Sequence, residues 1–507
     1  MTVKNKNIVK RSLRTILTAL LAVLLCASLA FAKERAEEQG VTITASGFSN
    51  NKVFTDDLRK TWARAGKDNS VTISCENGLS SVYIEFDQIP EQTWTITSSE
   101  TGKTAECESK GFLHVFTDIT ELLGEHPKEV VLRFAEGTQI SNVYAFSGEE
   151  PSWVQKWEPM LKTADIMLIS THADDEQLFF AGVLPYYAVE RKVDVQVVYF
   201  VQHFHKAHKV FDHVRPHEQL DGLWTVGIRN YPYMSEFPDV YGEGTSRSNA
   251  ISNLLSSFRY YGYARDDFQK FVVDTIRKFK PHVIVTHDFD GEYGHAAHIL
   301  NADVTAKAME LVGDPAQYPE SAAEYGTWVP DKLYVHLYKE NPIVMDWDTP
   351  YDSLGGLTPF QVTQKGFDCH ETQTIYWFWD WLCGTRSNPI TKATQIRKYS
   401  PCKYGLYFTN VGPDVKGGDF LENVYTYAQQ RIDEAEAEKK RQEEEAERKR
   451  QEEEAERKRL EEERKRQEEE QRACEEAAKR RRLIISAGCI VAAAALIILL
   501  IIRSRRR

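Results

Sequence analysis

The stretch ADIMLISTHADDE, residues 164–176, decides the fold class of this chain. A nearly continuous apolar run is followed at once by one imidazole and two adjacent carboxylates. Short apolar runs of this kind are typical of strands that are buried on both faces of a parallel sheet. Polar side chains directly after such a strand lie at the carboxyl edge of the sheet, where α/β proteins bind their ligands. The sequence therefore predicts an α/β domain with a functional site at residues 171–176.

Strand-like and helix-like segments alternate after this stretch. A helical pattern over residues 177–189 precedes an apolar run over 193–201, and an amphipathic pattern over 266–280 precedes a second apolar run, PHVIVTHD, at 281–288. This alternation predicts a three-layer domain with a Rossmann-like parallel sheet. We assign residues 156–421 to it.

The region before this domain has a different pattern. Residues 41–150 contain short segments rich in β-branched and aromatic residues, such as VTITASGF and SVYIEF, with turn residues between them. This pattern favours an antiparallel all-β sandwich, which we assign to residues 33–155. Its order of segments resembles the discoidin, or galactose-binding-like, sandwich that is often attached to carbohydrate enzymes. A structural spacer without a ligand is the alternative.

The C-terminal region is strongly charged and then strongly apolar. The nine-residue repeat KRQEEEAER has almost no apolar positions, so it lacks the seam of a coiled coil. Pairs such as Glu445 and Lys449 favour a single solvated helix, and we predict a helical stalk over residues 422–482. The uncharged segment LIISAGCIVAAAALIILLII, residues 483–502, has about the 20 residues needed to cross a membrane. A basic tail, 503–507, follows the predicted transmembrane helix.

The N-terminus predicts the compartment. TILTALLAVLLCASLAFA, residues 15–32, follows several basic residues and ends in a small-x-small site. We predict a signal peptide over residues 1–32, with an uncleaved anchor as the alternative. A signal would direct the body outward and leave the basic tail inside. The expected location is therefore the cell membrane, with a single span and an extracytoplasmic body.

Composition excludes some partners and cofactors. The 507 residues carry a net charge of −12, and no basic stripe appears in the middle of the chain, so a nucleic-acid partner is not expected. None of the eight cysteines forms a CxxC pair, which argues against a cysteine-based zinc site. In an extracytoplasmic protein, Cys75 with Cys107 and Cys383 with Cys402 are candidate disulfides.

The strand-end motif THADDE has the side chains of a hydrolytic metal site. His172 and Asp175, three residues apart on a turn that enters a helix, can face one divalent ion. Asp174 would then face the open side, where it could accept a proton from metal-activated water. Glu176 is expected to support these groups from behind.

A second motif, GEYGHAAH at residues 291–298, ends the apolar run that begins at residue 281. The two histidines of an HxxH pattern at the start of a helix lie near the same face. One of them can complete the metal site, and the other can act as an acid. Together, the two strand-end motifs predict one catalytic metal centre.

HADDE, RPHEQLDGLWTVGI and GEYGHAAH, in this order, resemble the PIG-L/LmbE-like family of zinc de-N-acetylases. That family includes N-acetylglucosaminyl-phosphatidylinositol deacetylase and the GlcNAc-inositol deacetylase of mycothiol synthesis. The resemblance covers about residues 160–410. It implies that His172, Asp175 and His298 bind Zn²⁺, or another divalent metal, and that Asp174 is the general base.

The resemblance also implies roles for five further residues. His295 would stabilise the oxyanion and assist proton transfer, and Tyr293 would polarise the carbonyl. Arg215 and Glu218 would lie near the substrate. His370, in CHETQ, matches a late family element and would line the pocket, with a buried structural histidine as the alternative.

The sequence departs from the family pattern at two positions. Ala173 replaces the proline of HPDDE, and Ala297 replaces the aspartate that usually lies in the HxxH motif. Neither missing residue binds zinc in the family. The lost aspartate could still change how the two histidines are held.

Two further segments have open interpretations. The histidines of QHFHKAHKVFDHVRPHEQ, residues 202–219, could bind a second metal, rim a sugar pocket or lie on a solvated loop. The aromatic segment IYWFWDWLCG, residues 375–384, could stack on sugar rings or pack in the core.

The function expected from these motifs is metal-dependent removal of the acetyl group from an N-acetylglucosamine-containing glycan or glycoconjugate outside the cell. A different amide, such as a longer acyl chain or a non-sugar substrate, would need the same motifs. The alternative from another class is a non-catalytic surface protein that binds carbohydrate through a degenerate deacetylase domain. The oligomeric state is not predicted.

Overall fold

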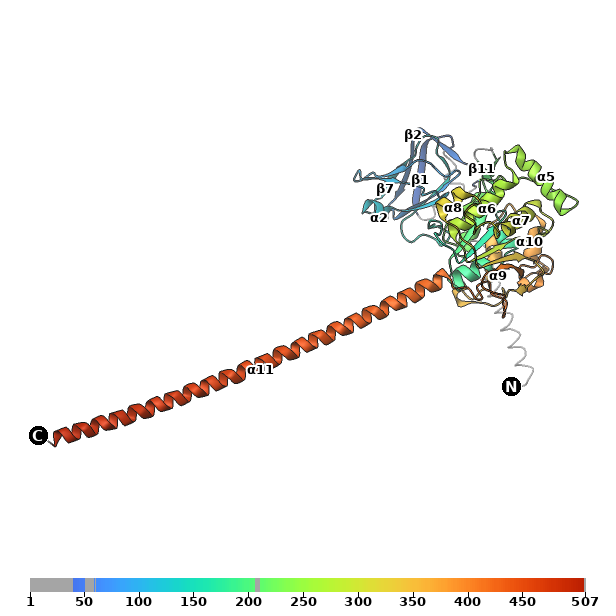
Figure 1. The fold of residues 1–507 in the computed structure, drawn as a ribbon. Coiled ribbons are helices and arrows are strands. Elements are labelled where there is room, and N and C mark those ends of the chain that lie inside the picture. The colour runs from blue at the N-terminus through green and yellow to red at the C-terminus, as the bar shows by residue number, and fades with distance from the viewer. Residues whose placement is uncertain (1–39, 51–58, 60, 206–209, 506–507) are drawn as a thin grey trace, which may run out of the picture. The chain divides into compact units, whose positions relative to one another are not determined.

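The computed structural model describes residues 40–50, 59, 61–205 and 210–505 (Figure 1). The chain divides into two compact units, Met1–Ala428 and Gln429–Arg507. The signal peptide expected at residues 1–32 lies outside the described residues.

The first part of unit one is an eight-stranded antiparallel sheet with the order β5-β4-β7-β2-β8-β3-β6, and β1 pairs with β2 outside this path. Its strands are β1 (Val41–Phe48), β2 (Ala63–Cys75), β3 (Ser81–Phe86), β4 (Trp94–Ser98), β5 (Thr104–Cys107), β6 (His114–Asp118), β7 (Glu129–Arg133) and β8 (Gln139–Phe146). A short helix, α2 (Ile119–Leu123), follows β6. The predicted antiparallel β architecture is confirmed; its galactose-binding-like type stays a prediction.

Strand β2 joins the two halves of this β region. Its C-terminal part pairs with β7, and Ala63 and Arg64 at its start pair with β8. Side chains alternate between buried and half-exposed along β4, which is the two-residue period of a strand with one covered face. The two halves enclose a common core, where the ring of Phe86 on β3 lies 5.3 Å from that of Trp94 on β4.

The second part of unit one is built on a seven-stranded sheet with the order β13-β10-β9-β14-β15-β19-β16. Its strands are β9 (Ile166–Ser170), β10 (Val195–Tyr199), β13 (Tyr233–Met234), β14 (Val283–Thr286), β15 (Lys332–His336), β16 (Pro342–Val344) and β19 (Lys403–Thr409). The first five strands in this order are parallel to one another, whereas β19 pairs antiparallel with both β15 and β16. The sheet is therefore mixed rather than purely parallel, as is common where strands are added at an edge.

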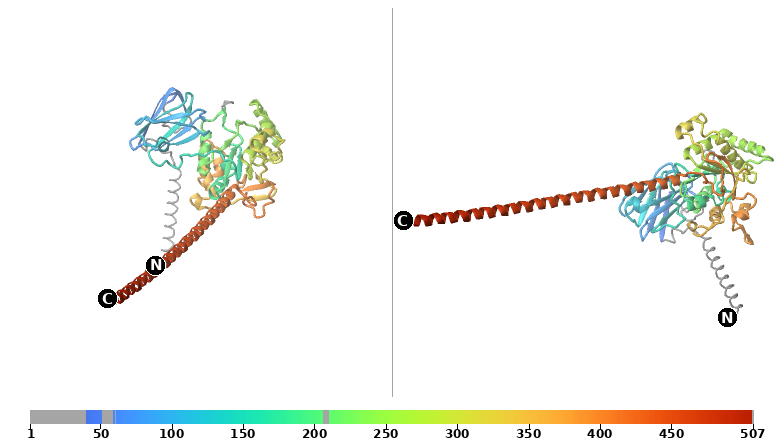
Figure 2. Two further views of the ribbon diagram at one scale, coloured as in Figure 1. Left: turned by 60° about the vertical axis from the view of Figure 1, so that its left-hand side comes forward. Right: turned by 60° about the horizontal axis from the view of Figure 1, so that its bottom comes forward.

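Helices cover both faces of this sheet (Figures 1 and 2). They are α3 (Asp175–Leu178), α4 (Arg215–Thr225), α5 (Arg247–Tyr260), α6 (Arg265–Phe279), α7 (Ala296–Ala308), α8 (Pro319–Tyr325), α9 (Pro359–Asp368) and α10 (Trp377–Leu382). Along β9, Ile166 and Leu168 pack in one core, and Met167 and Ile169 pack in a second. Burial of alternate side chains in two separate cores confirms the three-layer arrangement.

The helix expected over residues 177–189 is interrupted. Helix α3 ends at Leu178, and a π-helical segment begins only at Pro185. Gly182 between them has a φ of +93°, and a Cβ there would lie 2.4 Å from the ring of Trp347. The chain therefore turns at a position that only glycine tolerates.

The second unit consists of the long helix α11, Tyr427–Ser504, whose first two residues still belong to unit one. The predicted stalk and apolar segment are thus one continuous helix, with ion pairs such as Glu445–Lys449 at 2.7 Å and Glu454–Lys458 at 2.8 Å. Among the described residues, it is the one helix long and apolar enough to cross a membrane, with a mean hydropathy of 2.9 over its apolar stretch.

All cysteines in the described part of the chain are free thiols. The candidate disulfides Cys75–Cys107 and Cys383–Cys402 are therefore not formed in this structure. The β region is held by its two-sided core instead.

Candidate metal centre

Two loops form the candidate site at the carboxyl edge of the sheet. Strands β9 and β14 are parallel neighbours, with Ile169 opposite Thr286. The segments that follow them, residues 171–175 and 287–298, therefore emerge side by side and each enters a helix. The predicted meeting of the two sequence motifs at one rim follows from this pairing.

Three candidate ligand atoms lie almost equally far from one another. Nδ1 of His172 is 3.0 Å from Oδ2 of Asp175 and 3.1 Å from Nε2 of His298. Nε2 of His298 is 3.1 Å from the same Asp175 oxygen. Around a tetrahedral ion with bonds of about 2.0–2.1 Å, neighbouring ligand atoms are about 3.3 Å apart. The spacing and the donor types suit a small divalent cation.

Each of these imidazoles faces a second carboxylate with its other nitrogen. Nε2 of His172 lies 3.4 Å from Oδ1 of Asp239, and Nδ1 of His298 lies 2.7 Å from Oε2 of Glu292. Metal-binding histidines almost always have such a partner, because it fixes the tautomer and the ring orientation. Neither Asp239 nor Glu292 was among the site residues predicted from the sequence.

The charges in the cluster reinforce one another. Burial opposes protonation of His172, but Asp239 and Asp175 raise its pKa to about 10. Burial opposes ionisation of Asp175, but His298 and His172 hold its pKa well below the usual range. Asp175 is therefore ionised, as a metal ligand must be.

Asp174 is held in a strained backbone conformation. Its φ is +124°, a region that non-glycine residues rarely adopt and that is frequent at functional sites. Burial raises the pKa of its carboxyl group to about 7, and Arg215, at 3.4 Å, opposes this rise. The backbone N–H of Asp174 donates to Glu176 over 3.1 Å. A buried carboxylate beside the candidate ligands has the position and basicity of a general base.

His295 lies at the exposed side of the cluster. Its ring is 4.6 Å from those of both His172 and His298, and its buried Nδ1 has no hydrogen-bond partner in the structure. Gly291 makes this loop possible: it has a φ of +70°, and a Cβ there would lie 2.6 Å from the carbonyl oxygen of His295. Tyr293 is 38% exposed beside His295, so the site opens to solvent here.

Glu292 connects three buried histidines. Besides His298, its carboxylate contacts Nδ1 of His287 at 3.1 Å and Nδ1 of His336 at 2.8 Å. Burial opposes ionisation of Glu292, but these histidines hold its pKa well below the usual range. The sequence offered one signal for Glu292, its place inside the GEYGHAAH motif. His336, the last residue of β15, belongs to neither of the two sequence motifs, so no signal in the sequence pointed to it.

Two groups of described side chains have ligand atoms within 4.8 Å of one another: His172 with His295 and His298, and Asp175 with His287 and His298. We favour His172, Asp175 and His298, because their atoms are only 3.0–3.1 Å apart.

His287 is a weaker candidate ligand, because both of its nitrogens are occupied. Nε2 accepts a hydrogen bond from the backbone N–H of Thr171 over 3.0 Å, and Nδ1 faces Glu292.

The remaining candidates lie at different distances from the centre. Arg215 contacts Asp174 and the carbonyl of Ala173. Glu218 accepts two hydrogen bonds from Thr372, at 2.8 and 2.6 Å. His370 is fully buried and lies 3.5 Å from Glu176 and against Gly222, and its predicted place at the pocket stays a prediction.

The described histidines of the 202–219 segment do not gather around a second ion. Nδ1 of His203 lies 3.5 Å from Asp239, whereas His213 and His217 contact the β region. Among the described residues, both groups that could hold a metal lie in the centre already described.

The aromatic segment has one face in the core and one at the site. Trp381 and Phe378 pack against the core, and Trp377 is 46% exposed. The ring of Trp377 lies 5.7 Å from that of Tyr293. The core-packing interpretation is therefore confirmed for Trp381 and Phe378, and stacking on sugar rings stays a prediction for Trp377.

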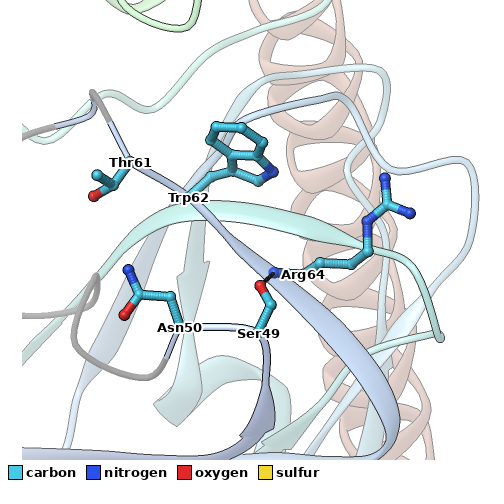
Figure 3. A pocket seen from close by; sticks show the side chains of 5 residues that line it. All are labelled: Ser49, Asn50, Thr61, Trp62 and Arg64. Carbon is cyan, nitrogen blue, oxygen red and sulfur yellow. Dashed lines mark hydrogen bonds between the residues drawn. The ribbon is translucent and has the colours of Figure 1, made fainter.

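A separate open hollow of about 460 Å³ lies in the β region, lined by Ser49, Asn50, Thr61, Trp62 and Arg64 (Figure 3). Ser49 accepts a hydrogen bond from the backbone N–H of Arg64, and the ring of Trp62 stacks on His213 at 4.2 Å. Trp62 therefore has one ring face already occupied by protein.

The geometry is that of an α/β protein with a candidate histidine–aspartate metal site. Residues 167–309 match the model of the GlcNAc-PI de-N-acetylase (PIG-L) family. This region of the chain therefore forms a PIG-L family domain.

Relatives match over part of their length. The chain is 29% identical over 185 residues to the 1D-myo-inositol 2-acetamido-2-deoxy-alpha-D-glucopyranoside deacetylase of Rhodococcus jostii, which covers 33% of this chain and 60% of that protein. It is 41% identical over 76 residues to the mycothiol S-conjugate amidase of Streptomyces coelicolor, covering 14% and 25% of the two chains. The chain thus spans less than two thirds of the length of these relatives.

Among solved structures, the N,N'-diacetylchitobiose deacetylase of Pyrococcus horikoshii aligns with a TM-score of 0.32 and 13% identity. The alignment covers 48% of this chain and 83% of that one.

Proposed function

We propose that this chain is a metal-dependent amide hydrolase that removes the acetyl group from an N-acetylglucosamine-containing glycan or glycoconjugate. One observation carries the proposal. The imidazoles of His172 and His298 each face Asp175 with one nitrogen and a second carboxylate with the other. A set of this kind orients two imidazoles and an ionised carboxylate toward one cation, and binding of the cation would displace the proton from each coordinating nitrogen.

In this proposal, His172, Asp175 and His298 hold a divalent cation, with Zn²⁺ as the expected ion for this donor set. The bound cation would act as a Lewis acid toward the amide carbonyl and toward water.

Asp174 accepts the proton of the attacking water, because its raised pKa matches this task near neutral pH. Arg215 fixes the orientation of Asp174 through their contact at 3.4 Å.

His295 and Tyr293 act on the oxygen of the amide. The unpaired Nδ1 of His295 supports a role as a hydrogen-bond donor to the developing oxyanion. Burial and the nearby Asp175 raise the pKa of Tyr293 above its usual range. Its hydroxyl therefore stays protonated and can donate a hydrogen bond to the amide oxygen. The amine leaves with the proton that Asp174 took from water, because burial and the neighbouring His172 hold the pKa of His295 well below its usual range, and acetate is the second product.

The substrate class rests on the relatives, whose names describe acetamido-deoxy-glucopyranoside deacetylases. The apolar end of α11 supports a membrane anchor for the body. An extracytoplasmic location of the body rests on the sequence of residues 15–32.

The test is metal analysis of the purified chain followed by an acetate-release screen over GlcNAc oligomers, peptidoglycan fragments and GlcNAc-lipids. Asp174→Asn should keep its metal and lose turnover by about 10²–10⁴-fold, because only the proton acceptor is removed. A wild-type rate in Asp174→Asn would disprove the assignment of the base. Glycan binding without bound metal or acetate release would favour the non-catalytic surface protein.

A further inference from the structure

Helix α4 has two polar faces with different partners. His217 and Asp221 lie four residues apart on one face, and His213, four residues earlier, precedes the helix on the same side. Arg215 lies nearly half a turn from His217, on the side toward the metal centre, and Glu218 lies between these two directions. The first face contacts the β region, and the second contacts Asp174 and Thr372.

An ionic network links Asp221 to the β region. Arg59 contacts the Asp221 carboxylate through both terminal nitrogens, at 2.5 and 3.2 Å. The same guanidinium contacts Glu85 on β3 at 2.5 and 2.9 Å. Gln155 donates to Asp221 over 2.6 Å. The side chains of Arg59 and Glu85 are 10% and 0% exposed, so solvent screens this network weakly.

A second buried contact joins two histidines. Nε2 of His114 on β6 lies 2.6 Å from Nδ1 of His217, and their rings are stacked 4.9 Å apart. Nδ1 of His114 faces Gln155 at 2.7 Å, so both polar networks share this glutamine. Both histidines are 1% exposed.

The segment that enters the helix is held in the same way. Nδ1 of His213 lies 2.6 Å from Asp87, and its ring stacks on Trp62. Asp212 accepts hydrogen bonds from the backbone N–H groups of Val214 and Arg215. The start of α4 is therefore fixed two residues before Arg215.

These contacts distinguish the β region from a module on a flexible linker. Such a module would meet its neighbour through a small, solvated interface. Here, buried charged groups and imidazoles of the β region pair with side chains of α4. Each pairing requires a defined orientation of α4.

We propose that the β region is a positioning element of the catalytic centre: by holding Asp221 and His217, it fixes helix α4 and thereby keeps Arg215 against Asp174. This inference rests on the proposed function for its kinetic consequence. It assigns the β region a role different from carbohydrate binding and from passive spacing. Arg59 and His114 are then positioning residues.

The kinetic test uses the full chain in detergent and the variant Arg59→Leu. We expect kcat to fall at least tenfold, with KM changed by less than twofold and metal content unchanged, because the candidate ligands are not on α4. The matched control is Arg64→Leu, an exposed arginine near the start of β2, which should keep the wild-type kcat. A lower melting temperature with an unchanged kcat would overturn the proposal.

A double-mutant cycle tests the route of the effect. In an Arg215→Leu background, Arg59→Leu should change kcat by less than twofold, because the group through which it acts is already absent. Fully independent effects of the two substitutions would overturn the proposal. If Arg59→Leu does not fold, Asp221→Asn replaces it, since this variant keeps the side-chain shape and removes the charge.

Amide hydrogen exchange provides a readout that needs no turnover. Arg59→Leu should speed exchange in residues 215–225 and 171–176, and should leave residues 265–279 unchanged. Faster exchange in 215–225 alone would show that α4 is not coupled to the Asp174 loop, whatever the outcome of the acetate-release screen. Absence of acetate release from the wild-type chain would instead contradict the proposed function.

Discussion

Oε2 of Glu292 lies 2.7 Å from Nδ1 of His298, on the side of the ring opposite the candidate metal position. The side chains of both residues are fully buried. The carboxylate can only accept a hydrogen bond, so Nδ1 of His298 carries the proton and Nε2 is free to bind a cation. The tautomer of a candidate ligand is thus set by a residue that needs no contact with the metal.

Glu292→Gln should lower metal affinity by about 10–100-fold, the usual effect of removing such a partner. The amide keeps the shape but can present a donor to His298 and favours the wrong tautomer. Competitive titration with a chromogenic chelator measures the affinity. Glu320→Gln, in the first turn of α8, is the matched exposed control. Equal affinities of Glu292→Gln and the wild type would rule out this role.

Asp239 has the corresponding position beside His172, with Oδ1 3.4 Å from Nε2. Asp239→Asn should also weaken metal binding, by about tenfold, at the lower end of the usual range because its side chain is 35% exposed. The same titration applies, and Asp266→Asn, on the exposed first turn of α6, serves as the control. A greater loss of affinity in Asp266→Asn than in Asp239→Asn would contradict the assignment.

The sequence predicted those parts of the site that lie in local motifs. His172 and Asp175 follow one apolar strand and His298 follows another, so parallel pairing alone brings them together. Asp239 lies in an irregular loop after β13, and His336 ends β15, so only the tertiary fold joins them to the centre.

The fold was predictable to a similar extent. Periodicity indicated the buried strands and the long helix α11. It did not indicate the break at Gly182, which depends on the distant Trp347, or the direction of β19, which depends on pairing with β15. Position 297 has an alanine without a polar side chain, and the carboxylate that faces Nδ1 of His298 comes from Glu292, five residues earlier.

Gly222→Ala should destabilise the fold, although alanine favours helices by about 1 kcal/mol over glycine. A Cβ at this position would lie 2.7 Å from Nε2 of His370 and 3.2 Å from the carbonyl oxygen of Gly366. Overpacking of a buried helix contact costs about 1–3 kcal/mol, so the steric term should exceed the helix preference. Denaturant unfolding measures the net change.

Gly148→Ala is the control for this substitution, because a Cβ there meets no atom within 4 Å. The double variant Gly222→Ala/His370→Ser should recover part of the loss, because it removes the imidazole that the new methyl group meets. Stabilisation by Gly222→Ala alone would show that α4 and α9 separate easily, contrary to their close packing.

The apolar end of α11 should integrate into membranes. An arginine at the centre of such a span costs about 2.5–3.5 kcal/mol of insertion free energy. Ala494→Arg should therefore shift the full chain toward the alkali-extractable fraction when membranes are washed with carbonate. Ala455→Arg, the same change in the charged part of the same helix, should leave extraction unchanged, because that part is solvated. Equal extraction of both variants and the wild type would show that residues 483–502 are not a membrane anchor.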